Sequence, residues 1–415
     1  MRPVRGRRLA AWFLGFTVLF SPYLIPGSES SPRLTDLVGM GLWALLAAAL
    51  LLGRALDVRT LGRLLPLLVL ALLWVMRDAL RVGTNPSAAQ VRWLLVPAYG
   101  YVLWHLARAP ETRRALVLGM FWGAAANLGV VALQRFGFTD LTIALGLASP
   151  RFEARWALVG GVVEVRPFGM WGHPNASSGV IAIGFPLVLG LIDEGRLRAG
   201  WMAAGLALVF GGSALTLTRS GMVVGGLLFV VWALGGAPTP RQRRARLGLV
   251  GAMVAAAAVV GPPGGWQRWL DPGTSTNQSE RTHATAAAFE LAVSHPAGLG
   301  DAFQAALIER TGGIPATHNA WLHFALTAGL PLTALVLAVV AGHAVTLAGR
   351  RTVEGWLALG MAGLFFFEEY FRASAFIILA GWLAATPTGL LAWRRRAEPA
   401  PSPAPDLPIP ATTWR

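Results

Sequence analysis

Apolar segments about as long as a membrane is thick recur along almost the whole chain, and short loops that contain arginine separate them. A helix needs roughly 20 apolar residues to cross the hydrocarbon core of a bilayer. Hydrophobic residues make up 55% of the chain and charged residues only 13%, with a mean hydropathy of +0.56. A water-soluble globular protein does not have these values, so the chain is predicted to be an integral membrane protein.

About twelve such segments can be placed, and they leave little of the chain for a separate soluble domain. The expected fold is all-α: a polytopic bundle of about twelve transmembrane helices, with a large external loop containing short helices. The expected spans are residues 9–24, 34–52, 61–75, 93–106, 115–133, 176–192, 199–215, 220–234, 247–260, 319–347, 356–367 and 373–393.

The arginine-rich loops give the expected orientation of these spans. The chain has no lysine and no cysteine, and its formal net charge of +15 comes from arginine. Because arginine in short loops favours the cytoplasmic side, both termini are placed in the cytoplasm, with external loops at about 134–175 and 261–317. This topology explains the positive net charge without nucleic-acid binding. We therefore expect membrane lipids, and no nucleic acid, as partners. The oligomeric state is left open.

Residues 1–398 are expected to form one transmembrane domain in the inner (cytoplasmic) membrane. The following segment, 399–415, is rich in proline and alanine and poor in large apolar residues. Such a composition cannot bury enough apolar surface to fold, so a disordered cytoplasmic tail is predicted.

A second set of arginines falls on the predicted outer side of the membrane. The planar guanidinium matches phosphate oxygens in pairs, so a cavity lined by such groups would suit a phosphorylated lipid headgroup. The alternative is that these arginines pair with nearby carboxylates. Arg219 stands apart because it lies within apolar sequence, where a charge is costly. The set comprises Arg77, Arg81, Arg92, Arg151, Arg155, Arg166, Arg219, Arg268, Arg281 and Arg310.

The segment 310–322 leads from a polar loop with glycine and proline directly into the apolar run 324–340. It contains His318 and Asn319 at the predicted first turn of a membrane helix. Histidine, with an ordinary pKa of about 6.5, accepts a proton near neutrality, so His318 is a candidate general base for a hydroxyl acceptor. Asn319 can orient a substrate or cap the helix. Arg310, at the start of the segment, is a candidate substrate-binding residue.

Other catalytic signatures are missing from the sequence. There is no Gly-rich phosphate loop, no Gly-x-Ser-x-Gly and no His-Glu-x-x-His. A hard cation prefers clustered carboxylates, and Glu368-Glu369 is the one adjacent acidic pair on the predicted outer side. We therefore expect no metal site and no cofactor, and assign charge neutralisation to arginine.

Three stretches together resemble the O-antigen ligase and O-antigen polymerase superfamily of bacterial envelope glycan transferases. Their order along the chain and their predicted side of the membrane agree with the family pattern, and the layout of the spans extends the likeness to the whole chain. One departure is Pro331, where the family often has glycine. The stretches are Arg166-Pro-Phe-Gly-Met-Trp-Gly-His-Pro-Asn175, then Leu217-Thr-Arg-Ser-Gly221, and last Glu280-Arg281 with His295-Pro-Ala-Gly-Leu-Gly300, Phe303, His318-Asn319, Leu322 and Gly329.

The resemblance implies an inverting, metal-independent glycosyltransferase facing the periplasm or exterior. Such an enzyme moves a glycan from an undecaprenyl-diphosphate carrier to a hydroxyl of a glycan or lipid core. By the same resemblance His318 would be the base, and Arg219 and Arg281 would hold the departing diphosphate. Arg166 and Asn175 would shape or bind the substrate.

Alternatives remain at this stage. A ligase, a polymerase and an oligosaccharyltransferase that acts on protein hydroxyls would share these residues. A transporter or flippase of an anionic lipid-linked sugar or small anion is the alternative from another class. It should place charges near the bilayer midplane and show repeat symmetry. Neither is found in the sequence, where the polar residues gather towards one predicted face.

The assignment of His318 gives a first prediction. Replacing His318 with alanine should abolish surface polysaccharide in a complementation assay, because the acceptor hydroxyl would keep its proton. Protein abundance in the membrane, followed by immunoblot, should stay unchanged. Undiminished polysaccharide at normal abundance would exclude His318 as the base.

Overall fold

The computed structural model describes residues 2–28, 31–82, 88–148, 155–159, 162–235, 244, 246–248, 250–251, 273–314, 316–317, 319–347, 350–367 and 373–388. Helices dominate this part of the chain, in agreement with the predicted helical fold. The difference is a short antiparallel hairpin in the first predicted external loop, formed by β1 (Arg155–Val159) and β2 (Val162–Arg166).

Four helices are long and apolar enough to cross a membrane, judged by their length and composition among the described residues. Five shorter apolar helices accompany them. These helices are consistent with a membrane protein, but they do not confirm twelve spans. Most of the predicted span 247–260 and the predicted tail 399–415 lie outside the described residues. The four long windows are Leu34–Leu51, Val58–Leu80, Pro110–Arg135 and Pro174–Asp193.

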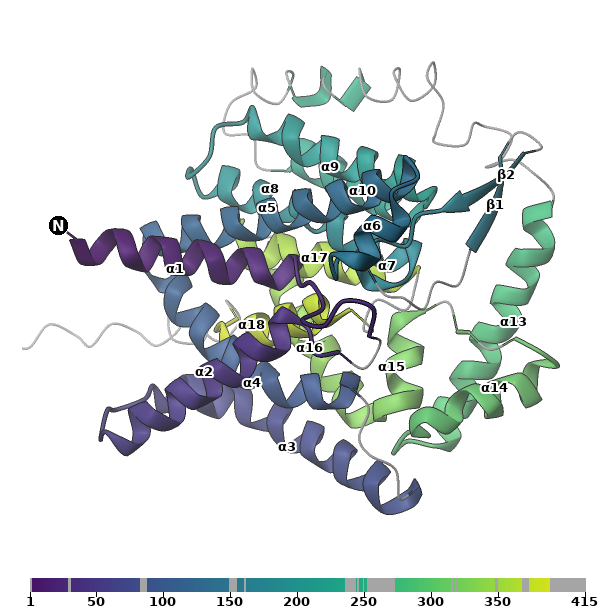
Figure 1. The fold of residues 1–415 in the computed structure, drawn as a ribbon, viewed down its shortest axis with the longest axis horizontal. Coiled ribbons are helices and arrows are strands. Elements are labelled where there is room, and N and C mark those ends of the chain that lie inside the picture. Colours follow the sequence, from purple (N-terminus) through teal and green to yellow (C-terminus); the bar gives the residue numbers. More distant parts are fainter. Residues whose placement is uncertain are drawn as a thin grey trace, which may run out of the picture.

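The first layer of the bundle pairs α1 (Arg2–Leu19) with α5 (Pro110–Arg135), which lie side by side in Figure 1. Glycines permit this approach, since a Cβ on Gly15 or on Gly119 would collide with a backbone carbonyl of the other helix. Small residues at helix contacts are typical of membrane bundles, where van der Waals packing drives association.

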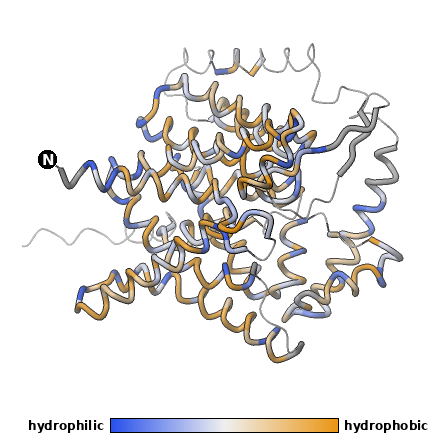
Figure 2. The backbone as a smooth tube through the Cα atoms, viewed as in Figure 1, coloured by the Kyte–Doolittle hydropathy of each residue, from blue (hydrophilic) through white to orange (hydrophobic). Residues whose placement is uncertain are grey.

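A second group of helices diverges from this pair in Figure 1. Here α4 (Ala88–Arg108) packs against α3 (Val58–Val82), α2 (Leu34–Leu51) and α18 (Ser374–Ala385). Only 22% of the α2 window and 28% of the α3 window are buried. Their outward faces are apolar, as the orange tube in Figure 2 shows, and are therefore suited to lipid contact.

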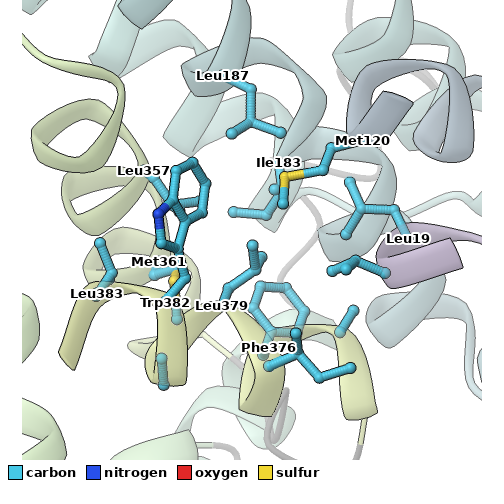
Figure 3. Close-up of a cluster of buried hydrophobic side chains, with 14 of the residues drawn as sticks. Leu19, Met120, Ile183, Leu187, Leu357, Met361, Phe376, Leu379, Trp382 and Leu383 are labelled. Carbon is cyan, nitrogen blue, oxygen red and sulfur yellow. The ribbon is translucent and has the colours of Figure 1, made fainter. Parts of the chain in front are cut away.

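The centre of the molecule is the most deeply buried part. Its helices are α7 (Pro174–Ala182), α8 (Gly184–Asp193), α9 (Trp201–Thr216), α10 (Ser220–Leu234) and α17 (Val353–Phe365). In the window that α7 and α8 form, 89% of the residues are buried. Figure 3 shows apolar side chains from α1, α5, α8, α17 and α18 in contact at this centre, together with Ile183, which links α7 to α8. The labelled residues are Leu19, Met120, Ile183, Leu187, Leu357, Met361, Phe376, Leu379, Trp382 and Leu383.

A further group of elements lies at the end of the molecule opposite the N-terminus of α1 (Figure 1). The hairpin lies there, together with α13 and α14. A small separate hydrophobic core joins α13, α14 and α15. The elements introduced here are α6 (Thr139–Ala144), η1 (Gly169–Trp171), α13 (Gly273–Ser294), η2 (Gly300–Ala302), α14 (Phe303–Thr311), α15 (Ala320–Ala328) and α16 (Leu330–Thr346).

The long apolar segment 319–347, predicted as one span, is broken into two helices. The break lies at Gly329, which separates α15 from α16 and has a φ of 99°. Glycine adopts this backbone conformation readily because it has no Cβ. Pro331 follows in the first turn of α16, where a missing N–H costs little.

Near the N-terminal end of α5, one buried arginine holds two carboxylates. Arg113 donates to Glu194 at 2.9 Å and to Glu354 at 2.7 Å, which ties α5 to the C-terminal cap of α8 and to the first turn of α17. The side chains are only 11%, 13% and 5% exposed. Breaking such a buried pair leaves an uncompensated charge, which is costly.

Arg113→Ala should therefore lower the free energy of unfolding by roughly 3–5 kcal/mol, because Glu194 and Glu354 would stay buried without their partner. Thermal unfolding in detergent micelles measures this effect. The control is Arg8→Ala, which breaks the exposed pair of Arg8 and Glu111 and should cost about 1 kcal/mol or less. Equal losses for the two variants would contradict a structural role for Arg113.

Candidate functional site

The turn between α9 and α10 presents Arg219 at the N-cap of α10. Just before it, Leu217 has a φ of 53°, and no other non-glycine residue in the described ranges has a positive φ. The hydroxyl of Thr218 lies 2.9 Å from that of Thr216 and donates to Ser178 of α7 at 2.6 Å. Neighbouring hydroxyls thus hold a strained backbone in place, and strain of this kind is typical of functional sites.

Arg219 lies within electrostatic range of Arg281, which is on α13. Burial lowers the pKa of the Arg219 guanidinium, and the positive charge of Arg281 lowers this pKa further. The fold therefore brings together two of the three predicted catalytic residues, although they are far apart in the sequence. A bound anion would offset the repulsion between the two guanidinium groups.

Two predicted substrate-binding residues support the same turn. Arg166, at the end of β2, donates from Nε to the backbone carbonyl of Thr216 at 3.0 Å and from Nη2 to Oδ1 of Asn175 at 2.7 Å. The backbone N–H of Asn175 donates to Nδ1 of His173 at 3.1 Å. Arg166 and Asn175 thus lie beside the turn that carries Arg219 and brace it through hydrogen bonds.

The third predicted catalytic residue, His318, lies outside the described residues, while Thr317 and Asn319 on either side of it are described. The hydroxyl of Thr285 on α13 donates to the carbonyl of Thr317 at 3.5 Å. Thr285 is one helical turn from Arg281, so the chain next to His318 contacts the helix that carries the second arginine.

Asn319 acts as the N-cap of α15. Its side-chain oxygen accepts from the N–H of Leu322 at 3.1 Å, and its backbone carbonyl accepts from the Thr317 hydroxyl at 3.0 Å. Of the two roles considered for Asn319, the structure shows the capping role.

A cavity of about 540 Å³ opens beside Arg281. It lies between α13, the first turn of α15 and the segment after α17, and its lining is mostly apolar. One charged group beside apolar walls suits an amphiphile with an anionic head. The lining residues are Arg281, Thr282, Thr285, Ala286, Phe289, Leu322, Phe366 and Phe367.

Arg310 lines a second hollow of about 650 Å³, and Phe289 lines both hollows. Arg310 donates from α14 to Glu290 of α13 at 2.7 Å, and both side chains are more than half exposed. The second hollow also includes Ser294 and His295.

Sequence reasoning missed Thr285, Phe289 and Phe366 as parts of this region. If the segment after Arg281 is assumed to be helical, Thr285 and Phe289 lie at i+4 and i+8, on the same face as Arg281. This spacing could have identified both residues from the sequence. Phe366 gave no such signal, because it comes from a distant helix end. Among the described residues, no group of three or more histidines, aspartates and glutamates is placed to hold a metal ion.

A comparison with protein families matches residues 204–337 to the O-antigen ligase family. The matched stretch runs from α9 into α16 and includes Arg219, Arg281, Arg310, His318 and Asn319. It supports the O-antigen ligase and polymerase superfamily, as the sequence motifs predicted. Arg166 and Asn175 precede the match. No curated protein matches the chain.

The arrangement predicts paired recognition of a diphosphate at Arg281. Arg281→Lys should weaken binding of inorganic pyrophosphate about tenfold, because an ammonium cannot offer the planar fork of a guanidinium. Isothermal titration of the detergent-solubilised protein measures the affinity, with Arg350→Lys, an exposed arginine after α16, as the control. Unchanged affinity in Arg281→Lys would show that paired recognition at this position is unnecessary.

Proposed function

We propose that this chain, which carries an O-antigen ligase domain, transfers a glycan from an undecaprenyl-diphosphate carrier to a hydroxyl acceptor on the outer side of the cytoplasmic membrane. The observation that carries the proposal is the placement of Arg281, which lines a mostly apolar cavity and lies within electrostatic range of Arg219. Two clustered guanidinium groups beside an apolar cavity form a receptor for a diphosphate attached to a lipid.

On the donor side, the bond that breaks joins the first sugar carbon to a diphosphate oxygen. The carrier diphosphate leaves with the electron pair of that bond, so negative charge grows on the leaving oxygen in the transition state. Arg219 and Arg281 offset this charge as fixed cations, which need no reorganisation during the reaction. In the proposal they fill the role of a metal ion.

On the acceptor side, the hydroxyl oxygen forms the new bond to the sugar carbon, opposite the leaving diphosphate, and the configuration inverts. The hydroxyl proton passes to His318, which later releases it to water. Asn319, as the cap of α15, fixes the backbone next to His318. Arg166 and Asn175 support the turn that presents Arg219.

The two hollows, which share Phe289 in their linings, suit different parts of the substrates. The first, with Leu322, Phe366 and Phe367, is apolar and suits the start of the prenyl chain. The second also contains the polar side chains of Glu290, Ser294, His295 and Arg310, which suit hydrogen bonds to a saccharide. The donor lipid and the acceptor sugar would then meet near α13. A ligase, a polymerase and a protein oligosaccharyltransferase all fit this arrangement.

Reconstitution into vesicles with a lipid-linked oligosaccharide and a saccharide acceptor tests the proposal. We expect release of undecaprenyl diphosphate together with a glycosidic product, with a rate that rises as the pH is raised from acid to neutral, because only neutral imidazole accepts a proton. His318→Gln should remove this rise. Movement of the labelled lipid between leaflets without release of the diphosphate would instead indicate a flippase.

A further inference from the structure

Arg77, near the end of α3, is a half-buried arginine of the predicted outer set that the proposed chemistry does not use. Its guanidinium donates to the backbone carbonyls of Ala297 and Thr327, the latter at 2.8 Å. These carbonyls are 220 and 250 residues away in the sequence. One follows α13 and the other lies in the last turn of α15, so Arg77 joins α3 to both helices.

Asp78 orients this guanidinium. It accepts from Nε of Arg77 at 2.7 Å, from the indole N–H of Trp74 at 3.0 Å and from the side chain of Gln90. The Arg77 and Asp78 side chains are each only 15% exposed. Because the aspartate is itself held by α3 and α4, the arginine is presented in one orientation.

The glycines of the His295–Gly300 motif lie directly against Arg77 and Asp78. A Cβ on Gly298 would lie 2.8 Å from Nη1 of Arg77, and one on Gly300 would lie 2.9 Å from the Asp78 carboxylate. Both glycines have a positive φ, 82° and 64°. The motif is thus shaped for close approach of the backbone to Arg77 and Asp78.

The same loop is bonded to the break between α15 and α16. The N–H of Leu299 donates to the carbonyl of Leu326 at 2.6 Å, and the N–H of Leu330 donates to that of Pro296 at 2.8 Å. Together with the separate hydrophobic core of α13, α14 and α15, these bonds make the three helices one unit, here called the outer unit.

The outer unit carries Arg281 on α13, and Asn319 caps its α15, whereas Arg219 belongs to the central bundle. The distance between the two guanidinium groups therefore depends on how the outer unit is attached. Arg77 provides a polar attachment, and Phe324 provides an apolar one through ring contacts with Trp74 and Trp93 at 5.9 and 4.8 Å.

We propose that Arg77, oriented by Asp78, is a positioning residue for glycan transfer: it fixes the outer unit so that Arg281 and the segment around His318 face Arg219. This inference rests on the proposed function. A displacement of about 1 Å at a reacting centre costs up to roughly a hundredfold in rate, so the attachment has catalytic consequences without touching substrate.

The variants are Arg77→Met, which keeps much of the side-chain volume, and Arg77→Lys, which keeps the charge but cannot reach two carbonyls and a carboxylate together. The matched control is Arg92→Met. Arg92 is also 15% exposed and donates to the Asp36 carboxylate at 2.8 and 3.0 Å, so it joins α4 to α2 and makes no hydrogen bond to the described residues of the outer unit.

The absence of cysteine permits a direct structural readout. Spin labels on cysteines that replace Glu309 of α14 and Phe136 after α5, both exposed, report the position of the outer unit relative to the bundle by pulsed electron resonance. Arg77→Met should broaden the distance distribution, and Arg92→Met should leave it unchanged. This readout needs no enzymatic activity, so it tests the attachment even if the proposed reaction is wrong.

Kinetics on the reconstituted protein then test the consequence. We expect kcat to fall at least about tenfold in Arg77→Met and to recover only in part in Arg77→Lys, with no change in Arg92→Met. An unchanged distance distribution in Arg77→Met would overturn the attachment. A broadened distribution with unchanged kcat, or full recovery with lysine, would overturn the positioning role.

Discussion

The repulsion between Arg219 and Arg281 is the interaction on which the functional interpretation depends. A protein gains nothing in stability by bringing two cations together, so the surrounding fold has to impose the contact. The hydroxyls that hold the α9–α10 turn fix the position of Arg219, and the packing of α13 against α14 and α15 fixes the position of Arg281. Such imposed repulsion is expected where an anion is to be bound.

The remaining charges are distributed differently. Arg92 and Arg310, two of the predicted outer arginines, each have a carboxylate partner, which was the alternative considered for that set from the sequence. Arg113, from a predicted inner loop, is also paired with carboxylates. Pairing lowers the cost of a charge in apolar surroundings. Arg219 and Arg281 in addition lie within electrostatic range of each other.

Glycine allows two different kinds of close approach in this structure. In α1 and α5 it lets two helices approach, as lipid-embedded bundles require. At Gly298 and Gly300 it lets the backbone approach a charged pair instead. The family match covers these two glycines as well as the candidate catalytic residues. Attachment of the outer unit and chemistry at its surface therefore belong to the same stretch of chain.

The sequence by itself determined the membrane character and the helical segments, because the hydropathy pattern acts locally. It also identified the O-antigen ligase motifs. It did not show the hairpin, the partners of Arg77 or the cavity beside Phe366. The role of His318 as a general base stays a prediction. Only the tertiary structure brought Arg219 near Arg281, because contacts between residues so distant along the chain arise from helix packing, which no local pattern encodes.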